Sequence, residues 1–380
     1  MNKKFFLGLL FPILLAANNV KAIDLYDNDQ KSELYGNMNS DHKINNHRVG
    51  SESFISHFGK NSASYNTFGV KGIFKINNIF SVHGQVEEEL NEHCYDIKKN
   101  TQPKNNLLFV GMKILSLGSI DYGRNYGVIH KALDYLSPIS LMLNNDIHLN
   151  AKDNYMLGLG NNIINYRNKN LFSFLNGLDL NLQYQGRNKD YKVKHPNGSG
   201  WGTEITYTNK KSGIGTVFSC FQSNNFSSLI KKNNNKISKA YLIGLKYNLN
   251  KTFLSALYSH TNNLVPYMDV RNFSKISDVT NHIKLSASYN FKSGLKPSII
   301  YSQSKSVFLS NAKNAHDKKI SSASLSKYLH LITSYNLSKN TLAYVSYKLN
   351  LLKSNDFTKN NLIPTNNNDL SIGILHHFSL

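Results

Sequence analysis

The segment that decides the fold is Gly177-Leu-Asp-Leu-Asn-Leu-Gln-Tyr-Gln-Gly186, in which apolar and polar residues alternate strictly. Leu178, Leu180, Leu182 and Tyr184 share one side, and the residues between them are all polar. Because successive side chains of a β-strand point to opposite faces, the pattern predicts a strand with one apolar and one hydrated face. An aromatic residue at the end of the apolar row is typical of a ring at the level of lipid headgroups.

The same alternation recurs elsewhere in the chain, at residues 243–249, 283–291 and 343–350. Short turns such as 292–294 alternate with long polar segments such as 353–368, as in outer-membrane barrels. At roughly 22 residues for each strand with its connection, the chain has room for about 16 strands. Closing the sheet leaves no unpaired edge in lipid. A soluble exported β-sandwich would show similar alternation, so the pattern alone leaves both folds open.

The composition narrows the classes of protein without identifying a partner. The chain of 380 residues contains 44 Lys and Arg against 23 Asp and Glu, a formal net charge of +21, with 22 Tyr, 20 Phe and 2 Cys. So many aromatic residues exclude a disordered polycation, and two cysteines exclude a disulfide scaffold. Heavy use of Asn and Lys is typical of an AT-rich genome, so the charge alone does not indicate an anionic partner. Lysine-rich segments such as 231–239 favour solvated loops over a nucleic-acid site.

The first 22 residues have the features of a secretory signal peptide. Lys3 and Lys4 precede the apolar run 5–17, and a short polar stretch then ends at Ala22. A basic start, a short apolar stretch and a small residue at the cleavage site are typical of such peptides. A membrane-spanning helix needs about 20 apolar residues, which this run does not reach. We therefore predict a signal peptide over residues 1–22 and one β-barrel over residues 23–380.

Several motifs, in order, resemble the general trimeric porins of Gram-negative outer membranes. They include Leu117-Gly-Ser-Ile-Asp-Tyr-Gly-Arg-Asn-Tyr-Gly-Val128, Ile164-Asn-Tyr-Arg-Asn168 and Gly294-Leu-Lys-Pro-Ser-Ile-Ile-Tyr301. The resemblance implies an all-β, 16-stranded antiparallel transmembrane barrel with an inward-folded third loop. It also implies an outer-membrane homotrimer, surrounded by lipid and lipopolysaccharide, through which small hydrophilic solutes and ions diffuse passively. No cofactor and no enzymatic activity are expected.

By the same resemblance, the third loop runs from Val128 to about Asn150, and its acids should face a basic wall across the constriction. The basic wall positions of the family fall here on Asn37, Thr67, Asn106 and Leu159. The first acid of the loop falls on Ser137, and the acids left nearby are Asp134 and Asp146. Lys71, Lys104 and Arg167 keep the parity of pore-lining positions. We therefore hypothesise a weakened transverse field with a mild preference for anions. Merely solvated wall lysines are the alternative.

Arg124 has a different implied role, at the contact between subunits. In the family, the matching arginine pairs with an acid on the second loop of the neighbouring subunit, and Glu92 or Asp96 could supply that acid here. Pairs between arginine and carboxylate are strong charge-assisted hydrogen bonds, so such a latch is chemically reasonable. The alternative is an ordinary solvent-exposed arginine of the barrel.

The remaining sequence features, which are the histidines, the two cysteines and the last residues, do not indicate a metal site or a catalytic site. His42, His47, His376 and His377 lack the spacing of metal ligands, so we predict no metal site. Nothing in the sequence indicates whether Cys94 and Cys220 meet. The family ends in an aromatic residue, which matches Phe378, but Ser379 and Leu380 follow it.

Two rival functions stay open on the sequence. The first is a non-conducting or narrowed outer-membrane barrel with a structural or surface-interaction role, and the second is a soluble, cation-rich binding protein.

Overall fold

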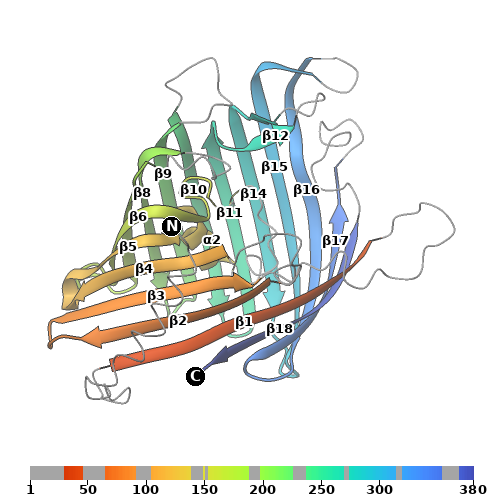
Figure 1. The fold of residues 1–380 in the computed structure, drawn as a ribbon. Coiled ribbons are helices and arrows are strands. Elements are labelled where there is room, and N and C mark those ends of the chain that lie inside the picture. The colour runs from red at the N-terminus through yellow and green to blue at the C-terminus, as the bar shows by residue number, and fades with distance from the viewer. Residues whose placement is uncertain are drawn as a thin grey trace, which may run out of the picture.

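A closed antiparallel barrel of 16 strands dominates the structure, a computed structural model (Figure 1). The structure describes residues 30–45, 65–90, 104–137, 149, 153–187, 197–225, 237–268, 274–313, 319–352 and 368–380. The predicted barrel architecture is thereby confirmed, and the alternative of two sheets packed face to face is wrong. Of the helices in these segments, none has the length and apolar character needed to cross a membrane.

The strands follow one another around the barrel in chain order. The first eight are β1 (Gln30–Asn45), β2 (Tyr65–Lys75), β3 (Phe80–Leu90), β4 (Lys104–Ile114), β5 (Gly118–Tyr126), β6 (Leu159–Asn168), β7 (Leu178–Gln185) and β8 (Asn197–Asn209). The others are β9 (Ile214–Asn225), β10 (Ile237–Leu249), β11 (Thr252–Asn262), β14 (Val279–Tyr289), β15 (Leu295–Lys313), β16 (Lys319–Asn336), β17 (Thr341–Asn350) and β18 (Asp369–Ser379). Between β11 and β14, β12 (Pro266–Met268) and β13 (Ser274–Ile276) form a separate small sheet.

The two faces of the sheet differ as the alternation predicts. On β7, Leu182 and Tyr184 are 44% and 50% exposed on the outer face, whereas Asn181, Gln183 and Gln185 are buried on the inner face. The pattern at 283–291 is cut short, because β14 ends at Tyr289 and the next five residues form a turn. Gly294 closes this turn with φ = 87°, a backbone conformation that favours glycine.

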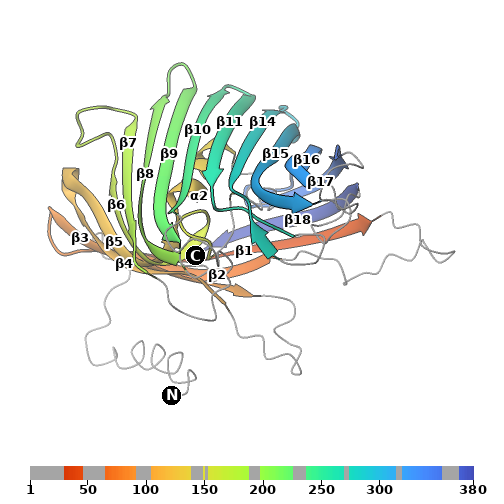
Figure 2. The same ribbon diagram turned by 90° about the horizontal axis from the view of Figure 1, so that it is seen from above.

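The third loop enters the barrel through the helix α2 (Val128–Leu136), which Figure 2 shows inside the ring of strands. One face of α2 is apolar and packs on β8 to β11, where it joins a buried cluster containing Phe221 and Leu242. Gly244 on β10 permits this close approach, because a Cβ there would lie 2.3 Å from Leu136 Cδ1. Apolar packing therefore holds the first part of the loop against one side of the wall. Residues 138–148 lie outside the described part of the chain.

The barrel closes where β1 pairs with both β2 and β18. Gly36 of β1 lies between Phe378 of β18 and Phe68 of β2, and its small size leaves room for the Phe378 ring. Leu380 continues the seam beyond Phe378: its N–H donates to Leu34 O at 2.8 Å, and Leu34 N–H donates to Leu380 O at 3.0 Å. The two residues after the terminal aromatic position thus extend the closing ladder.

Deletion of Ser379 and Leu380 is expected to weaken the closed barrel. Each lost hydrogen bond contributes roughly 0.5–1.5 kcal/mol net, so the free energy of unfolding should fall by about 1–3 kcal/mol. Urea unfolding of the refolded barrel in detergent micelles measures this loss. The matched control, Leu380→Ala, keeps both backbone bonds and should stay within about 0.5 kcal/mol of the parent chain. An equal loss in the control would show that the side chain matters and the backbone bonds do not.

Candidate functional site

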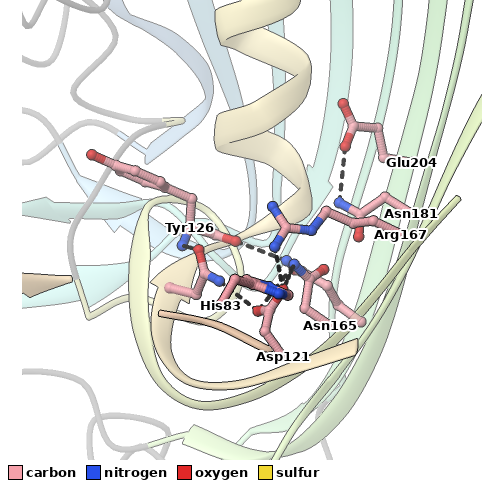
Figure 3. Close-up of polar contacts among 9 residues, drawn as sticks. His83, Asp121, Tyr126, Asn165, Arg167, Asn181 and Glu204 are labelled. Carbon is pink, nitrogen blue, oxygen red and sulfur yellow. Dashed lines mark hydrogen bonds and ion pairs between the residues drawn. The ribbon is translucent and has the colours of Figure 1, made fainter. Parts of the chain in front are cut away.

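The polar contacts that can shape the field in the lumen gather between α2 and the inner wall. Figure 3 shows the cluster, to which the inward-facing positions of neighbouring strands contribute His83, Asp121, Asn165, Arg167, Asn181 and Glu204. These residues come from β3, β5, β6, β7 and β8. Alternation along each strand explains why polar residues far apart in sequence share one patch of wall.

Asp121 is the centre of this cluster and is 1% exposed. Arg167 Nη2 donates to Asp121 Oδ2 in an ion pair. Asn125 Nδ2 donates to Asp121 Oδ1 at 2.7 Å, and His83 Nε2 lies 4.0 Å from Oδ2. The carboxylate is therefore held by one cation and by hydrogen bonds, and it neutralises much of the Arg167 charge that would otherwise face the lumen.

Lys131 of α2 contributes a second cation beside the same wall. Its Nζ is buried and has no hydrogen-bond partner among the described residues. Burial lowers the pKa of the Lys131 ammonium to about 8; the Arg167 charge adds to the shift, whereas Glu204 and Asp121 oppose it. Glu204 itself accepts a hydrogen bond from Asn181 Nδ2 at 3.0 Å. At this contact the loop supplies a cation and the wall supplies acids, the reverse of the arrangement that the family resemblance implied.

The C-terminal end of α2 is fixed by a different set of contacts. Lys246 Nζ donates to Tyr135 O at 3.0 Å and lies 3.3 Å from the centre of the Tyr135 ring. The Tyr135 hydroxyl donates to Tyr207 O at 2.7 Å. A lysine at the last carbonyls of a helix also suits the helix dipole. α2 is thus anchored to β8 and β10 by polar contacts as well as by its apolar face.

Three of the predicted pore-lining positions face inward and carry no charge. Asn37 Nδ2 donates to Thr67 Oγ1 at 3.1 Å, from a directly opposite position on the neighbouring strand. Asn106 is buried and donates from Nδ2 to Glu87 Oε1 at 2.9 Å. Leu159 is also buried, at the start of β6. Neutral groups that bond to one another and to Glu87 therefore occupy the stretch where the family pattern places basic side chains.

The basic residues among the predicted pore-lining positions are either paired with an acid or have side chains outside the described part of the structure. Lys71 forms an ion pair with Glu33, with 2.9 Å between Nζ and Oε2, and lies over the Tyr35 ring. Arg167 pairs with Asp121, as described above. Lys104 begins β4 opposite Glu89, but its side chain lies outside the described part of the structure. The charges that can be placed on this part of the wall are therefore compensated by neighbouring acids.

The structure describes only some of the residues that were predicted for the constriction loop and the subunit contact. Asp134 is an exposed residue of α2, and the buried Ser137 follows the helix, where its N–H donates to Leu133 O at 2.9 Å. Asp146, Glu92, Asp96 and Cys94 lie outside the described residues. Cys220 is a buried free thiol on β9. Within the described segments, no group of three His, Cys, Asp or Glu residues could hold a metal ion.

Arg124 has a partner within its own chain that the sequence analysis missed. Its guanidinium contacts Asp153 through both oxygens, Nη1 to Oδ1 at 2.5 Å and Nη2 to Oδ2 at 3.3 Å. Nη1 also donates to Asn161 Oδ1 at 2.9 Å. Arg124 is therefore not an ordinary solvent-exposed arginine, since it is 8% exposed. Its role at a subunit contact stays a prediction.

The sequence and the fold are both similar to those of known proteins of one family. Residues 27–378 match the model of a family described as Gram-negative porin. A porin-like protein of Buchnera aphidicola subsp. Schizaphis graminum is 35% identical over 379 residues, which cover 98% of each chain. Outer membrane protein F of Serratia marcescens is 31% identical over 392 residues, covering both chains completely. A solved structure of Salmonella typhi OmpF with daunomycin superimposes with a TM-score of 0.78 at 27% identity, over 93% of this chain and 99% of that chain.

Lys131→Met is expected to stabilise the barrel at neutral pH. Because folding lowers the lysine pKa to about 8, the charged form costs the folded state free energy that is fully present below pH 8 and disappears as the pH rises toward 10.5. At about 1.36 kcal/mol per pKa unit, the gain at pH 7 is at most about 3 kcal/mol. Urea unfolding at pH 7 and near pH 10.5 measures it.

The matched control is Lys211→Met, on an exposed turn between β8 and β9, which should change stability little at either pH. A Lys131→Met variant that is less stable than the parent at pH 7 would show that the ammonium group is a net stabilising partner of Asp121 and Glu204.

Proposed function

The chain belongs to the Gram-negative porin family, and on this basis we propose that its barrel is a passive diffusion channel with a weak transverse field. As a porin with the barrel of this family, it lies in the outer membrane and forms a water-filled channel. The family and the fold favour a channel over an enzyme. The solutes that we propose are small and hydrophilic, because many polar and charged side chains lie on the inner face outside the apolar patch that α2 covers.

One observation carries the proposed weak field: the two wall cations Lys71 and Arg167 are neutralised locally by acids. Lys71 pairs with Glu33, and Arg167 pairs with Asp121. Two opposite charges a few ångströms apart produce a field that falls off quickly across a water-filled lumen. The positions Asn37, Thr67 and Asn106 add dipoles but no net charge. Selectivity then follows from the net positive charge of the chain and is a mild preference for anions.

Planar-bilayer recordings of the refolded protein test this function. Discrete conductance steps are expected, and the reversal potential in a KCl gradient should indicate a permeability ratio for chloride over potassium between 1 and about 3. Lys71→Gln leaves Glu33 without its cation and should shift the ratio toward potassium. Lys251→Gln, in the turn on the opposite side of the ring, should leave the ratio unchanged.

Two outcomes of these recordings would contradict the proposal. The absence of conductance steps would favour a non-conducting barrel with a structural or surface role. Clear selectivity for potassium in the parent chain would show that the acids of the wall determine the field.

We also propose that the chain assembles as a homotrimer, like its OmpF-type relatives, and that the outer face contacts lipid and lipopolysaccharide. The apolar outer face, on which Phe68, Val70, Val110 and Tyr122 are each more than 40% exposed, suits contact with lipid or with a neighbouring subunit. A cleaved signal peptide over residues 1–22, which lie outside the described residues, suits export to this membrane.

Arg124→Ala should lower the melting temperature of the trimer on a semi-native gel. The change removes the pair with Asp153 and, if the latch forms, the bond to Glu92 of the neighbouring subunit as well. Asp153→Asn isolates the first contribution and Glu92→Gln the second, so each should cause a smaller decrease than Arg124→Ala. If Asp153→Asn alone reproduces the whole decrease and Glu92→Gln has no effect, Arg124 acts within its own subunit and the latch is wrong.

A further inference from the structure

A large cavity lies at the end of the lumen where the short turns are. Its volume is about 960 Å³, and it is bounded by β1 to β6 together with the turns that follow β4 and β6. Its charged lining consists of Lys31, Lys71, Lys113, Arg167, Lys169 and the acid Glu33, with His83 beside them. Five cationic side chains therefore share, with the Glu33 carboxylate and the C-terminal Leu380, a concavity of the size that holds small ligands.

Three of these cations are uncompensated. Lys71 is paired with Glu33, and Arg167 is paired with Asp121, which lies behind it in the wall. Lys31, Lys113 and Lys169 are exposed and have no ion-pair partner within the described part of the chain. These three residues line the cavity from β1, from β4 and from the turn after β6. This end of the lumen therefore holds a concentrated positive potential, whereas the charges beside α2 cancel.

Lysines at the mouth of a barrel are often simply hydrated, and the same chain offers examples. Lys210, Lys251 and Lys339 lie on other turns at this end, outside the lining of the cavity. The three uncompensated lysines differ because they share one concave surface with low-dielectric walls, which strengthens their combined attraction for an anion. Convergence on a cavity, and not positive charge as such, is what points to a ligand.

We propose that this cavity binds small anions that carry two or more phosphate groups, at the short-turn end of the channel. The inference rests on the proposed function, because it names a class of solute that the channel would retain. Each ammonium is a compact point charge with three donors and suits one phosphate. A monovalent anion would be satisfied by one lysine, whereas a chain of phosphates contacts several lysines at once. The ligand class therefore follows from the number of unpaired lysines that line one cavity.

Isothermal titration calorimetry of the detergent-solubilised trimer with inorganic tripolyphosphate tests the site without requiring conductance. Saturable binding is expected, and its affinity should decrease as NaCl is added. The double variant Lys113→Gln/Lys169→Gln should weaken binding by about tenfold or more, since it removes two of the three free cations. The control Lys251→Gln/Lys339→Gln changes the net charge equally on the same end of the barrel, and it should stay within about twofold of the parent.

The outcomes separate this inference from the channel function. Heats without saturation, or equal weakening in the test and control variants, would overturn the polyphosphate site even if the barrel conducts KCl. Specific binding to a barrel that gives no conductance steps would support the site and reject the diffusion channel. Refolding of both double variants is checked by the trimer band on a semi-native gel. If the test variant fails to refold, Lys31→Gln, Lys113→Gln and Lys169→Gln are titrated singly, and unchanged affinity in all three would also overturn the proposal.

Discussion

A sheet that faces lipid must satisfy every backbone N–H and C=O within the protein, and the rest of this structure depends on that constraint. The chain meets it by closure, because β1 pairs with β18 as well as with β2. Once the ring is closed, alternation assigns each side chain either to lipid or to the lumen. The polar cluster around Asp121, the neutral stretch at Asn37 and the cavity at the short-turn end are all consequences of that assignment.

Charge is distributed unevenly along the lumen that closure creates. Beside α2, cations and acids neighbour one another, and Lys131, whose Nζ is buried, interacts electrostatically with Asp121 and Glu204. At the short-turn end, by contrast, the exposed lysines outnumber the acids of the cavity lining. A solute therefore meets little net field beside the helix and a positive region at one mouth.

The sequence could predict the barrel and the inward positions, because both follow from local alternation and from motifs such as the one ending at Val128. Asp121 and Arg167 lie within quoted motifs and share the parity of lumen positions, so their pairing could have been found. The position of Lys131 could not, because it depends on where α2 packs, which is set by Phe221 and Gly244, 90 and 113 residues farther along the chain (221 − 131 and 244 − 131). The Arg124–Asp153 pair depends likewise on the path of the third loop.

The seam between the first and the last strand also has a consequence for how the protein is made. His377 contacts Asn37 across it, and 340 residues separate the two. Contacts this distant in sequence form late, and until they form both end strands expose unpaired edges that attract other chains. The barrel therefore stays open, with unpaired edge strands, until β18 is available to pair with β1. A chain that is truncated before β18 cannot close and is prone to aggregation.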